Sequence, residues 1–159
     1  MLIRSWTFRN EIQCYYYDRT QALKQWVALR ENVPASEFAR AERMNSAERA
    51  QTFLLARSLL RKKLSEILNF APESFEILLT PIGKPFLSDD PQFVKSNADL
   101  PSFSLSHSEN RILIAISPNA WTFGADIQYT EHSVDFERIS ERLFSDEHHK
   151  EITRLSGEA

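Results

Sequence analysis

Cysteine is almost absent from this sequence, and long apolar runs are absent altogether. Cys14 is the only cysteine among 159 residues, which excludes an intrachain disulfide framework, a multi-cysteine zinc site and an iron–sulfur cluster held by the chain's own thiolates. No apolar run approaches the roughly 18 residues that span a bilayer, and the first residues, MLIRSWTFRNEIQ, lack the apolar stretch of a signal peptide. We therefore expect a cytoplasmic protein in a reducing compartment, with no membrane partner.

The sequence also has little excess charge. The formal net charge is −3, with 26% charged and 42% hydrophobic residues, as in an ordinary globular domain. There is no run of five or more like charges and no basic stretch interleaved with aromatic residues, so nucleic acid is not expected as a partner. Basic residues are concentrated between Arg40 and Lys63, a segment that contains seven basic and two acidic residues. That segment is either a solvated helix face or an anion-binding wall.

Glycine is the third scarce residue, and two of the three glycines lie beside groups that could bind a ligand. Gly83 is followed by Lys84 and Pro85, and Gly124 precedes Asp126 by two positions. Glycine lets a backbone approach a ligand closely, while the lysine adds a positive charge and the proline stiffens the turn. An ordinary β-turn is the alternative interpretation of the first group.

Two further groups of polar side chains lie at expected strand ends. His107 is flanked by Ser106 and Ser108, and an imidazole with two hydroxyls could bind a phosphate, although a structural histidine is the alternative. Asp126 and Gln128 alternate along the chain, so in a strand they would share one face. A carboxylate there could bind magnesium.

The order of periodic segments predicts an α+β fold. Alternation predicts one or two strands within residues 1–17. Apolar spacing predicts a short helix over 20–30 and, most clearly, a long helix that starts at a capping box formed by Asn45 and Glu48 and ends before Pro72. Further strands are predicted at 75–80, 103–105, 111–117 and 122–128, the last three as an antiparallel meander, with a loop over 88–100 and helices over 134–143 and 147–155.

Six segments, in this order and spacing, resemble a known family: TFLLARSLLRKKL, GKPFL, FSLSHS, RILIAIS, FGADIQ and RLFSDEH. Together they are similar to the 4′-phosphopantetheinyl transferases of the surfactin-synthetase-activating type, from about Arg40 to Glu147. The resemblance implies two similar α+β halves, each an antiparallel sheet packed on a long helix, with the active site between them. Residues 1–118 would be the first half and 119–159 the beginning of a second, truncated half. The incomplete cleft would leave an apolar face prone to self-association.

The resemblance also implies a reaction and a set of residues. Family members transfer the phosphopantetheine arm of coenzyme A to a serine of an acyl or peptidyl carrier protein, and they require magnesium. Carried over by motif, Gly83, Lys84 and Pro85 would line the adenine and phosphate pocket. The 3′-phosphate would be held by Ser106 and His107, with help from Arg40 and Arg57. Asp126 and Gln128 would bind the metal.

The sequence departs from the family pattern at three places. Ser104 replaces the usual Asn before the SHS segment, and Gln128 replaces a carboxylate, which should lower the affinity for magnesium. The family's Lys-Glu helix follows at a greater distance from the Phe-Ser segment than Lys150-Glu151 does, so we expect no catalytic role for this pair, and no catalytic residue is identified. The chain is therefore expected to be a transferase homologue of doubtful activity, or a non-catalytic fragment that binds coenzyme A or a carrier protein.

Overall fold

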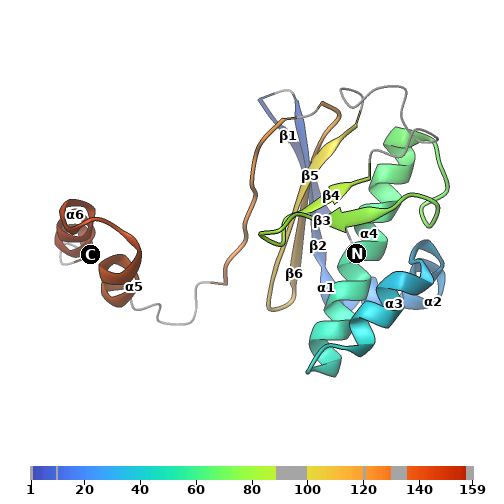
Figure 1. The fold of residues 1–159 in the computed structure, drawn as a ribbon, viewed down its shortest axis with the longest axis horizontal. Coiled ribbons are helices and arrows are strands. Elements are labelled where there is room, and N and C mark those ends of the chain that lie inside the picture. Colours follow the sequence, from blue (N-terminus) through green and yellow to red (C-terminus); the bar gives the residue numbers. More distant parts are fainter. Residues whose placement is uncertain (1, 10, 89–99, 120, 130–135, 157–159) are drawn as a thin grey trace. The chain divides into compact units, whose positions relative to one another are not determined.

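The computed structural model describes residues 2–9, 11–88, 100–119, 121–129 and 136–156. The chain forms two compact units, Met1–Gln128 and Tyr129–Ala159. The first unit has the predicted α+β fold, in which an antiparallel sheet packs on one long helix (Figure 1). The division into transferase-like halves at residue 118 stays a prediction.

The sheet of the first unit has four strands. They are β1 (Leu2–Phe8), β2 (Ile12–Asp18), β5 (Ser102–Ser108) and β6 (Arg111–Ser117). The strand order is β1-β2-β6-β5, and every neighbouring pair is antiparallel. The chain therefore brings its N-terminal hairpin beside β6, so that β1 and β5 are the two edges of this sheet.

The helices occupy the middle of the sequence. They are α1 (Arg19–Leu23), α2 (Trp26–Leu29), the 3-10 helix η1 (Arg30–Asn32), α3 (Ala35–Glu42) and α4 (Ala47–Leu68). The long helix is confirmed, but its N-cap is Ser46, whose Oγ accepts a hydrogen bond from the Arg49 N–H, rather than Asn45. The sequence predicts a single helix over 20–30, but the structure has two short helices there. The prediction missed the break because the apolar spacing continues through it.

The hydrophobic core lies between α4 and one face of the sheet, called here the inner face. Alternate residues of β5 and β6 point into it, among them Phe103, Ile112 and Ile114. They pack against fully buried leucines of α4 such as Leu60 and Leu64. Every second residue of these strands faces the long helix, so the apolar side chains of both are buried together. This burial of apolar surface is the main source of the unit's stability.

The outer face of the sheet is covered by the extended segment 121–128, which is not the strand that the sequence predicts. Phe123 and Ala125 pack against buried residues of β2 and β6, including Cys14. The segment is bonded to β5 through serine side chains, and β6 pairs with β2 instead. Of the predicted three-stranded meander, the antiparallel pair β5–β6 is confirmed and the third strand is wrong. An extended chain lying on a sheet alternates buried and exposed residues just as a strand does, so its period cannot reveal whether a ladder forms.

A small separate hairpin precedes β5. It consists of β3 (Ile77–Leu79) and β4 (Pro85–Leu87), which pair antiparallel. Gly83 has φ +84° in the connecting turn, and its N–H donates to the Thr80 carbonyl at 2.8 Å. Its conformation is one that side chains rarely adopt, so glycine is required there by the turn itself. The loop predicted over 88–100 lies mostly in residues 89–99, outside the described residues.

The second unit contains the two predicted C-terminal helices, α5 (Phe136–Leu143) and α6 (Asp146–Ser156). Two of its polar contacts join serines to histidines: Ser140 Oγ lies 2.7 Å from His149 Nδ1, and Ser145 Oγ lies 2.9 Å from His148 Nδ1. Across the described part of the chain, none of the helices is both long and apolar enough to cross a bilayer.

Candidate functional site

Two arginines of α4 are buried, and a carboxylate from α3 holds them. Arg57 and Arg61 are 3% and 2% exposed. Glu37 Oε1 lies 2.9 Å from Arg61 Nη2 and 3.6 Å from Arg57 Nε. Two guanidinium groups share one buried carboxylate, so this cluster keeps an excess positive charge inside the protein.

A hollow of about 300 Å³ opens beside this cluster. Arg40, which is exposed, lies on its wall with Arg57, and both stack on the ring of Phe53, at 5.1 and 5.5 Å from its centroid. Burial and neighbouring cations lower the pKa of Arg57 to about 10 although Glu37 opposes the shift. Its Nη1 is buried without a hydrogen-bond partner. The hollow is lined by three arginines and by the three carboxylates of Glu37, Glu73 and Glu76, so the anion-binding wall stays a prediction.

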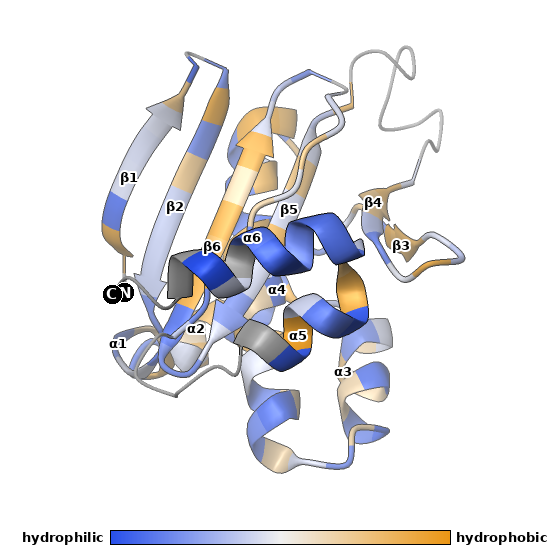
Figure 2. Ribbon diagram, turned by 90° about the vertical axis from the view of Figure 1, so that its left-hand side faces the viewer, coloured by the Kyte–Doolittle hydropathy of each residue, from blue (hydrophilic) through white to orange (hydrophobic). Residues whose placement is uncertain are grey.

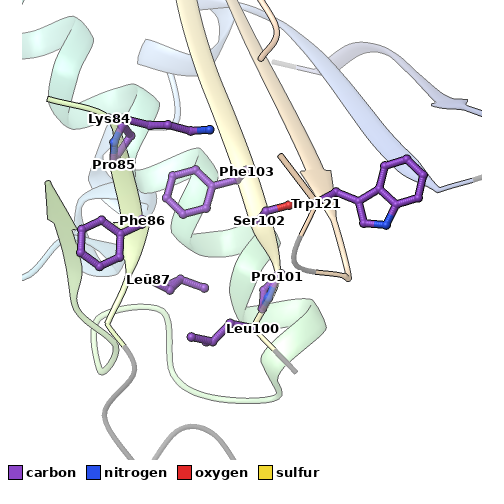
Figure 3. A pocket seen from close by; sticks show the side chains of 9 residues that line it. All are labelled: Lys84, Pro85, Phe86, Leu87, Leu100, Pro101, Ser102, Phe103 and Trp121. Atoms are coloured by element: carbon purple, nitrogen blue, oxygen red, sulfur yellow. The ribbon is translucent and has the colours of Figure 1, made fainter. Parts of the chain in front are cut away.

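Lys84 and Pro85 line a second hollow of about 330 Å³ between β4 and β5. Figure 3 shows Phe103 and Leu87 between these two strands, with the Trp121 ring beyond β5. The floor is apolar, and among the lining residues that the structure describes Lys84 is the only charged one. Such a surface suits a flat, partly apolar group next to an anion.

Segment 121–128 joins three of the motifs that are distant in sequence. Lys84 Nζ donates to the Phe123 carbonyl at 3.3 Å. Ser106 Oγ donates to Asp126 Oδ1 and accepts from the Ile127 N–H at 3.3 Å. The GKP, SHS and GAD segments therefore meet along one extended stretch of chain, which we call the motif belt, defined by residues 123–127.

The structure separates Ser106 from its neighbour His107. Successive residues of a strand point to opposite faces, and Ser106 faces the motif belt while Leu105 joins the inner core. His107, which is exposed, therefore lies on the inner side of the sheet near its edge. The Ser106 hydroxyl is already hydrogen-bonded to the belt, so it is suited to orient Asp126. The His107 imidazole lies on the other face, where a ligand could contact it independently of Ser106.

Asp126 and Gln128 are both exposed at the end of the belt. Among the described residues, Ser106 is the hydrogen-bond partner of Asp126, through Oδ1, and Oδ2 accepts none. In the part of the chain that the structure describes, no three His, Cys, Asp or Glu side chains gather into a metal site. Carboxylate and amide oxygens are the donors that magnesium takes, and it is commonly held by one or two carboxylates together with substrate phosphates and water. The pair fits a magnesium ion only as part of such a shared site.

Sequence reasoning missed Glu37 and Ser104. The signal for the first was present: Arg57 and Arg61 stand four residues apart inside an apolar helix stripe, so a buried carboxylate had to face them. Ser104, noted only as a departure from the family pattern, holds the belt by accepting from the Ala125 N–H at 2.9 Å and donating to the Ala125 carbonyl at 3.2 Å.

Comparison with solved structures shows the same fold in two enzymes. A holo-(acyl-carrier-protein) synthase from Bacillus anthracis, solved in complex with CoA (3′,5′-ADP), gives a TM-score of 0.50 at 17% identity, covering 67% of this chain and 92% of that one. The holo-[acyl-carrier-protein] synthase from Neisseria meningitidis gives 0.51 at 12% identity, covering 67% and 94%. At these identities the likeness is one of fold alone.

Comparison of sequences gives the family. The 4′-phosphopantetheinyl transferase HetI of Nostoc sp. is 29% identical over 135 residues, which are 85% of this chain and 54% of that protein. The putative 4′-phosphopantetheinyl transferase slr0495 of Synechocystis sp. is 29% identical over 124 residues, 78% and 48% of the two chains. The chain thus spans about half the length of these curated relatives. Residues 20–119 match the family described as 4′-phosphopantetheinyl transferase, N-terminal, so the chain belongs to the 4′-phosphopantetheinyl transferases.

Proposed function

We propose that this chain carries the coenzyme A side of a phosphopantetheinyl transferase that works in the cytoplasm. In that reaction the hydroxyl oxygen of a carrier-protein serine bonds to the phosphorus that bears the pantetheine arm. The bond to adenosine 3′,5′-bisphosphate breaks, and the serine proton leaves. The observation that carries the proposal is the motif belt, which bonds two distant segments: Lys84 donates to its Phe123 carbonyl and Ser106 donates to its Asp126 carboxylate.

The belt supports separate roles for its residues. The Lys84 ammonium has three donors and uses one on Phe123, so the others can meet the diphosphate of coenzyme A. Gly83 and Pro85 shape the turn that places this lysine beside the apolar hollow, where the adenine would lie. Ser106 orients Asp126 rather than touching the ligand.

The 3′-phosphate would be bound by exposed side chains that donate hydrogen bonds. His107 and Arg40 are both exposed, and an imidazole N–H and a guanidinium can each donate to a phosphate oxygen. Arg57 is buried against Glu37, so it would act by its charge rather than by contact. Its charge would add to that of Arg40 at the phosphate.

Magnesium would be held by Asp126 with Gln128 and the diphosphate oxygens. When bound, the ion would neutralise charge on the leaving diphosphate. Asp126 keeps one carboxylate oxygen for it, because only the other is bonded to Ser106. Gln128 adds a neutral donor, so the affinity should depend on the ligand being present.

Intact-mass analysis of an apo acyl carrier protein tests the proposal. The carrier is incubated with this chain, coenzyme A and magnesium, beside a full-length transferase as positive control. A gain of one phosphopantetheine that is lost with Asp126→Asn, but kept with Glu31→Gln in an exposed carboxylate of η1, supports the assignment. No gain with the control active contradicts transfer by this chain alone.

Binding without transfer is the second candidate function. It is favoured by the scarcity of metal donors, because among the described residues no group of three or more His, Cys, Asp or Glu side chains could hold a metal ion. Titration calorimetry with coenzyme A, with and without magnesium, distinguishes the two. Magnesium-independent binding together with no transfer identifies a binding module.

A further inference from the structure

The motif belt is held to the sheet by side chains rather than by a backbone ladder. Ser104 Oγ accepts from the Ala125 N–H at 2.9 Å and donates to the Ala125 carbonyl at 3.2 Å, and Ser106 Oγ accepts from the Ile127 N–H at 3.3 Å. Among the described residues, none of the belt's backbone groups bonds to another backbone group. Figure 1 shows this stretch as a plain ribbon on the side of the sheet away from α4. The belt therefore lacks the ladder that fixes each of the four strands.

The belt buries little of its own surface. Phe123, Ala125 and Ile127 are half-buried, and the two residues between them, Gly124 and Asp126, are exposed. By contrast, six of the seven residues of the core strand β6 are buried, and Figure 2 shows this strand as strongly hydrophobic. A segment with few buried apolar contacts and solvent-exposed hydrogen bonds opens at a lower free energy than the core on which it lies.

The single cysteine of the chain lies under the belt. Cys14 of β2 is opposite Ala115 of β6, and the two are 7% and 1% exposed. Phe123 and Ala125 pack against the cluster to which both residues belong, and among the described residues no other partly buried apolar side chain does so. The neighbouring strands cover the flanks of Cys14 and the belt covers its outward side, so loss of the belt would expose the thiol.

We propose that the motif belt is a strap that opens from the outer face as one unit while the four-stranded sheet stays folded. Opening breaks the hydrogen bonds to Ser104 and Ser106 and uncovers Cys14. It also separates Lys84 Nζ from the Phe123 carbonyl and Ser106 from Asp126. The arrangement of the three motif segments therefore depends on the belt being closed.

Two other events would also expose Cys14, and each has a different signature. Global unfolding exposes a large surface, so modification through it accelerates steeply with urea. Fraying of the edge strand β1, which is the other neighbour of β2, would not depend on Ser104. Opening of the belt exposes few residues and breaks the bonds to Ser104, so it depends weakly on urea and strongly on this serine.

Thiol modification of the whole chain with an aromatic disulfide reagent tests the proposal. Cys14 is the only thiol, so the aromatic thiolate released as it forms a mixed disulfide reports one site. In low urea the modification rate of the parent chain should be nearly independent of urea. Ser104→Ala should raise this rate about tenfold, because two hydrogen bonds of the belt are lost. Burial raises the pKa of the Cys14 thiol, so all rates are compared at one pH.

Ser65→Ala is the matched control. Its hydroxyl also donates to a backbone carbonyl, that of Phe70 at 2.6 Å, but away from the belt, so the rate should change by no more than about twofold. Urea unfolding followed by circular dichroism checks that each variant is folded and gives the slope of global unfolding. The proposal is overturned by a modification rate that follows this slope from the lowest urea concentrations, by no effect of Ser104→Ala, or by equal effects of the two variants.

Discussion

Replacing Glu37 by Gln should be the most damaging single change in the described core. The carboxylate is 8% exposed and accepts from Arg61 Nη2 at 2.9 Å and Nε at 3.3 Å, and it also pairs with Arg57. The amide keeps the shape but removes the negative charge, so two nearly solvent-free guanidinium groups lose their counter-ion. Breaking a buried pair from one side costs about 3–5 kcal/mol, a large share of the roughly 5–15 kcal/mol that stabilises a domain.

Urea unfolding followed by circular dichroism measures this loss. With a slope of about 2 kcal/mol/M, a loss of about 3 kcal/mol lowers the midpoint by about 1.5 M. Glu73→Gln is the matched control, because Glu73 is an exposed carboxylate on the wall of the same hollow; it should change stability by no more than about 0.5 kcal/mol. A loss below about 1 kcal/mol for Glu37→Gln would refute the idea that one carboxylate balances both arginines.

Three further changes test the site and the core. His107→Ala should weaken binding of coenzyme A more than that of dephospho-coenzyme A, because only the former has a 3′-phosphate; equal losses by calorimetry would contradict its role. Asp126→Ala should remove the magnesium dependence of coenzyme A binding, and an unchanged response would exclude it as a ligand. Burial raises the pKa of the Tyr17 phenol, so above pH ~10 the unfolded chain releases a proton that the folded chain keeps. Stability should then fall by about 1.4 kcal/mol per pH unit, and Tyr17→Phe should flatten that slope in alkaline urea titrations; a slope unchanged by the substitution would show that other groups cause it.

Local signals in the sequence identified most of the elements and the motif segments. The apolar stripe that ends at Leu68 predicts α4, and the runs around Phe103 and Ile114 predict β5 and β6. These predictions succeeded because helix and strand periods depend on neighbouring residues only. The family assignment from six short segments is confirmed by the match over residues 20–119.

The pairing of distant segments could not be predicted in the same way. The alternation of segment 122–128 indicated a strand, yet the segment lies across the outer face and is held by Ser104 and Ser106. Similarly, Glu37 and Arg61 are 24 positions apart, and only packing of α3 on α4 makes them one ion pair. A period shows which residues share a face, but it carries no information about what lies opposite that face.

The sequence by itself therefore determined the family, the long helix, most of the strands and the residue types available for phosphate and magnesium. The tertiary structure decided how they combine. It placed Ser106 and His107 on opposite faces of the sheet and hydrogen-bonded Ser106 to Asp126. It also buried Arg57 while leaving Arg40 exposed. The physical reason is that residue type and period are local, whereas burial and counter-ions depend on which segments meet.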